Sequence, residues 1–178
     1  MDAVDVEARR ARFEVIAREL VDPLRRFLVR RTDAATADDA LGDTLLVLWR
    51  RYDDLPDDVL PYAYGVARNC LANAERGARR QGRVAGRIAT LDPPREDVTP
   101  AADDRLGDAL AALPQDDADL LRLWAWEQLT PSEIATVLEI TPNAVSIRLH
   151  RARRKLAEEL RKVETPAGHE GSTEGRDT

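Results

Sequence analysis

The sequence of 178 residues predicts an all-α protein made of two small helical domains joined by a flexible linker, the second with a helix-turn-helix. Apolar residues recur at helical spacing through most of the chain, and no segment alternates apolar and polar residues over a strand's length. Two helix-start signals, each a threonine followed by proline, succeed one another at residues 130–131 and 141–142.

The first domain is expected over residues 1–85. Its opening helix carries an apolar stripe that ends in Phe27 and Leu28, and Pro23 is expected to kink or break it. A second helix is expected to begin near Thr36, because a threonine can cap the free N–H groups of a first turn. Its inward positions are expected to be Leu41, Leu45 and Leu48.

A loop is expected over residues 53–58, and Pro61 suits the first turn of the next helix. One face of that helix is small and apolar, formed by Ala63, Val66, Ala67, Cys70, Leu71 and Ala74. Cys70 is therefore interpreted as a core residue rather than a reactive thiol.

Residues 86–104 interleave prolines with acidic side chains and are expected to form an acidic linker. The second domain is expected over residues 105–163. Residues 164–178 contain almost no apolar side chain and are expected to be a disordered tail.

Residues 129–153 carry the strongest functional signal. Thr130, Pro131 and Glu133 form a capping box at the start of a short helix, and Thr141 repeats the start signal after a tight turn. Two capped helices with apolar inner faces predict a helix-turn-helix, whose second helix reads the major groove. The residues expected to face the DNA are Asn143, Ser146, Ile147, Arg148, His150, Arg151 and Arg154.

Two basic tracts support contact with nucleic acid although the net charge is −6. Residues 68–87 hold six arginines against the single acidic residue Glu75, and residues 145–162 hold seven lysines and arginines against two glutamates. The local field near a phosphate decides such contacts. A merely solvated arginine-rich face is the alternative interpretation of each tract.

Composition argues against several other classes. The single cysteine cannot form an internal disulfide, and two histidines cannot build a histidine-rich metal site. No nucleophile–base pair, phosphate-cradling glycine loop or metal-spaced cluster occurs, so no enzyme, metal or cofactor is expected. No stretch approaches the ~20 apolar residues of a membrane span, and residues 1–12 are charged throughout, so a cytoplasmic protein is expected.

Three stretches carry a resemblance to a known family: ADDAL at residues 37–41 running to LW at 48–49, YAYGVARN at 62–69, and ALP at 112–114 running through the helix-turn-helix to RLHRAR at 148–153. In this order, with an acidic linker between the second and the third, they resemble the bacterial extracytoplasmic-function (ECF) sigma factors of the sigma-70 family. The resemblance implies a non-enzymatic protein that binds core RNA polymerase and directs promoter-specific initiation. The resemblance also implies an anti-sigma factor as a further candidate partner.

The resemblance also implies a role for each part. Residues 1–85 resemble sigma region 2, and residues 105–163 resemble region 4, which binds the −35 duplex. The polymerase is expected to dock on Asp38, Asp39, Asp43, Leu46 and Trp49. Capture of the −10 element as a single strand needs aromatic faces and cations, and the residues expected to supply it are Tyr62, Tyr64, Arg68, Asn69, Arg76, Arg79 and Arg80.

Several residues depart from the family pattern. Gly42 and Leu45 replace a usual glutamine and phenylalanine, and Glu139 replaces a glycine in the turn, where a left-handed backbone strains it. Ser146 and Ile147 replace a frequent basic–serine pair, so an unusual promoter specificity is expected. The rival interpretation is a stand-alone helix-turn-helix regulator whose N-terminal helices sense a ligand or dimerise.

Overall fold

A computed structural model describes residues 3–85 and 104–164, with side chains over 6–78 and 105–162. The expected linker over 86–104 and tail over 164–178 lie almost entirely outside the described residues. The described elements are α1 (Ala3–Val29), α2 (Ala34–Arg50), the 3-10 turn η1 (Tyr52–Asp54), α3 (Val59–Ala85), α4 (Asp104–Ala111), α5 (Gln115–Ala125), α6 (Pro131–Leu138) and α7 (Pro142–Glu164).

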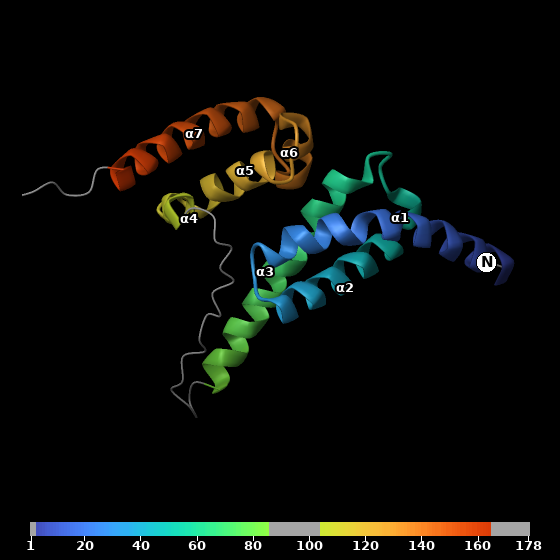
Figure 1. The fold of residues 1–178 in the computed structure, drawn as a ribbon. Helices are drawn as coiled ribbons and strands as arrows, with labels where there is room; N and C mark the ends of the chain where they lie inside the picture. Colours follow the sequence, from blue (N-terminus) through green and yellow to red (C-terminus); the bar gives the residue numbers. More distant parts are fainter. Residues whose placement is uncertain (1–2, 86–103, 165–178) are drawn as a thin grey trace, which may run out of the picture.

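The helices form two groups (Figure 1), named here the N-terminal module (α1–α3) and the C-terminal module (α4–α7). The all-α prediction is confirmed, and no strand occurs within the described ranges. The two modules also pack against each other, chiefly through α3 and α6. The sequence did not predict this contact.

Helix α1 runs through Pro23 without interruption, so of the kink or break expected there the break does not occur. Proline removes one hydrogen bond from the helix interior. The burial of Leu20, Leu24 and Phe27 on either side of Pro23 offsets the loss of that hydrogen bond.

Helix α2 begins two residues before Thr36, because Asp33 is its N-cap. The Asp33 carboxylate accepts hydrogen bonds from the Thr36 backbone N–H (3.0 Å) and hydroxyl (2.7 Å), and these bonds hold the pKa of Asp33 below its ordinary value. The cap therefore stabilises α2 most above the ordinary pKa of an aspartate, and its contribution is lost as the pH falls through the lowered value.

The inner face of α2 also differs from the prediction. Leu48 is buried as expected, but Leu41 and Leu45 are only half-buried. The other inward positions carry small side chains, which bring α2 close to its neighbours: Ala37, Ala40 and Thr44. The buried Thr44 hydroxyl donates to the Ala40 carbonyl at 2.6 Å, so the polar group is satisfied.

Helix α3 packs against α1, α2 and α6. Four residues of the predicted small face, Ala63, Ala67, Cys70 and Leu71, are buried, whereas Val66 and Ala74 are half-buried. Burial raises the pKa of the Cys70 thiol, which agrees with its interpretation as a core residue.

The predicted helix-turn-helix is formed by α6 and α7. In its capping box the Glu133 N–H donates to the Thr130 hydroxyl (3.3 Å) and the Thr130 N–H donates to the Glu133 carboxylate (2.6 Å). The Thr141 hydroxyl caps α7 by accepting from the Ala144 N–H at 3.2 Å. Between the helices Glu139 adopts φ 55°, the left-handed conformation that the sequence predicted.

Replacing Glu139 with glycine should raise the free energy of unfolding by about 0.5–1 kcal/mol. The left-handed conformation costs a non-glycine residue roughly 1–2 kcal/mol, and the extra freedom of glycine in the unfolded chain returns part of that gain. Urea denaturation followed by circular dichroism measures the difference. As a control, Ala157→Gly on the right-handed helix α7 should lower the same quantity by about 1 kcal/mol. Equal losses in both variants would contradict strain at Glu139.

Candidate nucleic-acid interface

The outer face of α7 presents a continuous set of exposed side chains that could meet DNA. It combines an amide, a hydroxyl, an apolar group, an imidazole and guanidinium groups, and Ile147 is 46% exposed. Every residue predicted for the −35 contact is exposed: Asn143, Ser146, Ile147, Arg148, His150, Arg151 and Arg154. The helix-turn-helix therefore brings together the groups that major-groove recognition requires.

Two other cations on α7 interact within the C-terminal module. The Arg153 guanidinium lies 3.7 Å from the centre of the Trp124 ring. The Lys155 ammonium is 2.6 Å from the Asp117 carboxylate. Each of these two cations therefore already has a partner on α5.

The residues predicted for the −10 strand lie along α3, but not all on its exposed side. Asn69 is exposed, and Tyr62 is half-buried with its hydroxyl accepting from Arg51 at 3.3 Å. Arg76 is exposed and donates to the Asn73 side chain at 2.6 Å. Arg79 and Arg80 belong to α3, but their side chains lie outside the described set.

Tyr64 is buried between the two modules. Its side chain is 3% exposed, and its ring lies 5.0 Å from that of Phe27. Burial raises the pKa of the Tyr64 phenol, and the negative charge of Glu127 raises it further. In this arrangement no base can stack on the Tyr64 ring.

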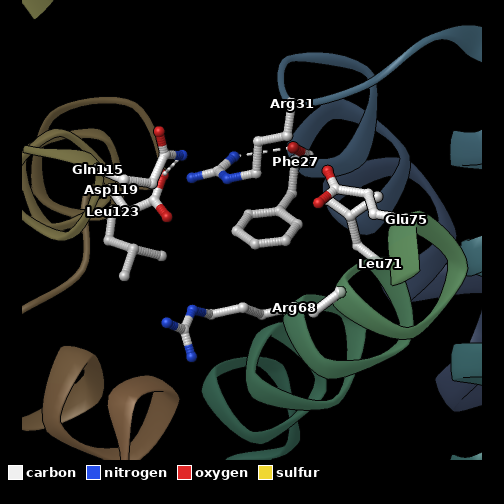
Figure 2. Close-up of a pocket in the computed structure, with 9 residues that line it drawn as sticks. Phe27, Arg31, Arg68, Leu71, Glu75, Gln115, Asp119 and Leu123 are labelled. Atoms are coloured by element: carbon white, nitrogen blue, oxygen red, sulfur yellow. Dashed lines mark hydrogen bonds between the residues drawn. The ribbon is translucent and has the colours of Figure 1, made fainter. Parts of the chain in front are cut away.

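Arg68 lines a cavity between the modules. Figure 2 shows Arg68 of α3 and Arg31, in the turn after α1, reaching into this cavity opposite Asp119 and Leu123 of α5. Arg68 is half-buried there, so its guanidinium is only partly available to a phosphate.

The residues predicted to dock the polymerase share the surface of α2. Asp39 and Asp43 are exposed, and Leu46 is 45% exposed. Asp38 lies 3.5 Å from Arg25 in an exposed ion pair. Trp49 is half-buried, with Phe13 against its ring at 5.3 Å.

Sequence reasoning missed the charged groups that join the modules. Glu127, in the loop between α5 and α6, accepts hydrogen bonds from Arg30 (3.0 Å) and Arg31 (3.2 Å) in the turn that follows α1. Burial lowers the pKa of Arg31, and Glu127 opposes that shift. The partners lie 97 and 96 residues apart in the chain, so no local spacing could have signalled them.

A second missed arginine supports the N-terminal module. Arg9 of α1 lies 4.8 Å from the centre of the Trp49 ring and 5.7 Å from that of Tyr52. It also donates to the Trp49 carbonyl at 3.2 Å and pairs with Asp53 at 3.2 Å. These contacts fix the end of α2 and the loop before α3.

Two other kinds of feature are absent from the described residues. Over residues with described placement, no group of three or more histidine, cysteine, aspartate and glutamate side chains could hold a metal ion. Among the same residues, no helix has both the length and the apolar character needed to cross a membrane.

Fold and surface together define a two-module helical DNA-binding protein with a helix-turn-helix in its C-terminal module. A family model described as Sigma-70, region 4 matches residues 103–156. The ECF RNA polymerase sigma factor SigL of Mycobacterium tuberculosis is 33% identical over 139 residues, which are 74% of this chain and 78% of SigL. The probable RNA polymerase sigma factor RfaY of Xanthomonas campestris pv. campestris is 29% identical over 140 residues, 72% of this chain and 35% of RfaY.

Solved structures support the same fold. The sigma factor RpoE, crystallised with the anti-sigma factor NepR from Bartonella quintana, matches with a TM-score of 0.62 at 19% identity, covering 86% of this chain and 98% of RpoE. CnrH, in complex with the cytosolic domain of CnrY, matches with a TM-score of 0.55 at 24% identity, covering 86% of this chain and 89% of CnrH.

The chain belongs to the ECF RNA polymerase sigma factors. It is a sigma factor that directs transcription initiation, as the resemblance implied. Membership of this family does not favour the rival interpretation as a stand-alone regulator.

Proposed function

We propose that the described surfaces divide the work of initiation among three helices. The exposed face of α2 docks on core RNA polymerase, α3 and the loop before it hold the −10 element as a single strand, and α7 reads the −35 duplex. The N-terminal and C-terminal modules then correspond to residues 1–85 and 105–163, the two domains expected from the sequence.

One observation carries this assignment. The seven side chains expected to meet the −35 element are all exposed on one helix of a fully capped helix-turn-helix. The neighbouring cations Arg153 and Lys155 are held by α5. Of the other cations, Arg154 lies 3.7 Å from Glu158 in an exposed ion pair, and the exposed Arg148 and Arg151 line a cavity that Asp117 of α5 also lines. A recognition helix of this kind distinguishes bases by hydrogen bonds and apolar contacts at their edges.

Run-off transcription with core polymerase over a promoter library tests the proposal. Addition of the chain should produce transcripts from defined start sites that share a −35 and a −10 sequence. Transcripts that start at random, or no transcripts at all, would refute it.

Under this proposal the protein acts in the cytoplasm. It carries out no catalysis of its own, since the polymerase forms the bonds of the transcript. An anti-sigma factor is a further proposed partner. Two structural relatives, RpoE and CnrH, were solved bound to partners, and the RpoE partner is an anti-sigma factor.

Replacing Arg151 with alanine should weaken binding of the selected −35 duplex by about 1–3 kcal/mol, the usual value for an arginine that reads a base. Arg153→Ala is the matched control, because that guanidinium stacks on Trp124. The control should leave discrimination between the selected and a scrambled duplex unchanged. Fluorescence titration of labelled duplexes measures both constants. Identical affinities for the Arg151 variant and the parent would exclude base reading by Arg151.

Replacing Asp39 with arginine should weaken binding to core polymerase by about tenfold or more, because a charge reversal removes an attraction and adds a repulsion. Glu7→Arg, the same charge change at an exposed position of α1, should leave the affinity unchanged. Binding is measured by titration with labelled core enzyme, and circular dichroism confirms equal helicity. Equal losses in both variants would indicate a general charge effect and remove α2 as the docking surface.

A further inference from the structure

A buried charge cluster joins the two modules. The Glu127 carboxylate lies between Arg30 and Arg31, at 3.0 and 3.2 Å, and its side chain is only 3% exposed. The Arg31 side chain is 10% exposed and that of Arg30 is 33% exposed. A buried charge is costly unless it is paired. Glu127 therefore keeps its buried position only while Arg30 and Arg31, in the turn after α1, remain paired with it.

Contacts within the N-terminal module hold Arg31 in position for this contact. Arg31 donates to the Phe27 carbonyl at 2.8 Å, and its guanidinium lies 3.7 Å from the centre of the Phe27 ring. Across the interface, Glu127 precedes Gln128, whose φ of 55° places a non-glycine residue in the left-handed region. Preorganised groups lose little conformational freedom when they associate, which favours the contact.

The same contact covers part of the surface proposed to capture the −10 strand. Tyr64 is 3% exposed, and Arg68 lines the cavity shown in Figure 2. The backbones of α3 and α6 approach so closely that a Cβ added at Gly65 would lie 3.4 Å from the Val137 carbonyl oxygen. No base fits between α3 and α6 at this separation, so stacking on Tyr64 requires the modules to part.

The contact also has a feature that limits its stability. The Arg31 Nη2 atom is buried, and within the described residues it has no hydrogen-bond partner. An unsatisfied buried donor opposes burial. The unsatisfied donor therefore lowers the free energy by which the cluster stabilises the contact between the modules. A weaker contact opens more readily.

We propose that Glu127, Arg30 and Arg31 form an autoinhibitory latch, which holds the C-terminal module over Tyr64 and Arg68 and so blocks capture of the −10 strand. The proposal rests on the strand-binding role proposed for α3. In the closed state Asn143, Ser146, Ile147 and His150 of α7 stay exposed, whereas Arg148 and Arg151 line a cavity with Arg68 of α3. The latch therefore lowers affinity for single strands.

The test compares the full-length parent with Glu127→Gln, which keeps the shape of the side chain and removes its charge. Glu14→Gln is the matched control, because Glu14 pairs with Arg10 at 3.2 Å within α1, away from the interface. Hydroxyl-radical footprinting with mass spectrometry measures the oxidation rate of Tyr64. Titration with a fluorescein-labelled oligo(dT) strand measures single-strand binding, since stacking tolerates any base.

In the Glu127 variant both the Tyr64 oxidation rate and the single-strand affinity should rise by about fivefold or more, the lower end of usual coupling between sites. The Glu14 variant should match the parent. Arg30→Gln, which removes the more exposed partner, should shift both quantities in the same direction by a smaller factor. Circular dichroism shows whether each variant is folded. Agreement between the Glu127 and Arg30 variants excludes misfolding of one variant as the cause of the change.

An unchanged Tyr64 oxidation rate in both latch variants would overturn the proposal. A raised rate without a gain in single-strand affinity would overturn the autoinhibitory role. Failure of the proposed function is recognised separately, as the absence of defined transcripts from the parent with core polymerase, because footprinting needs neither polymerase nor promoter.

Discussion

The structure depends on the packing of α3, which is buried on two sides at once. One side presents Ala63, Ala67 and Cys70 to the N-terminal module, and the other brings Gly65 against the backbone of α6. Small side chains permit helices to approach closely, because helix separation follows the size of the residues at the contact. A helix committed in this way has only a narrow strip left for a ligand, and Asn69 lies on it. Packing therefore competes with the strand capture proposed for α3.

Much of the fold was predictable because its determinants are local. The capping box of Thr130 and Glu133 depends on residues a few positions apart, where spacing and side-chain type suffice. The left-handed conformation of Glu139 was implied by the family resemblance, in which a glycine is usual at that position of the turn. The inner face of α2 was predicted less well. Periodicity places Leu41 and Ala37 on nearby parts of a helix, and the choice between them depends on how closely α1 and α3 approach. That distance is a tertiary property, absent from the pattern of one helix.

The candidate site divides in the same way. Helical geometry alone predicted which side chains of α7 are exposed. It did not predict the contacts that the other cations of α7 make. Whether Arg153 reaches a phosphate or stacks on Trp124 depends on the position of α5, which the sequence of α7 does not contain. The cluster of Glu127 with Arg31 is the extreme case, since its partners are 96 residues apart. Tyr64 was predicted as a stacking surface for the same reason, because the module that buries it lies far along the chain.

Salt weakens contacts with DNA more than it weakens the ion pairs between the two modules. Contacts to phosphates weaken steeply with salt because binding releases counterions. The pair of Arg31 and Glu127, with side chains 10% and 3% exposed, is screened much less. With a net charge of −6, the chain as a whole does not attract DNA, so affinity depends on local clusters of cations such as Arg68. In the described arrangement Arg68 is half-buried and Tyr64 is buried. Under the proposed latch, the closed state therefore withholds both the charge and the stacking surface on which single-strand binding depends.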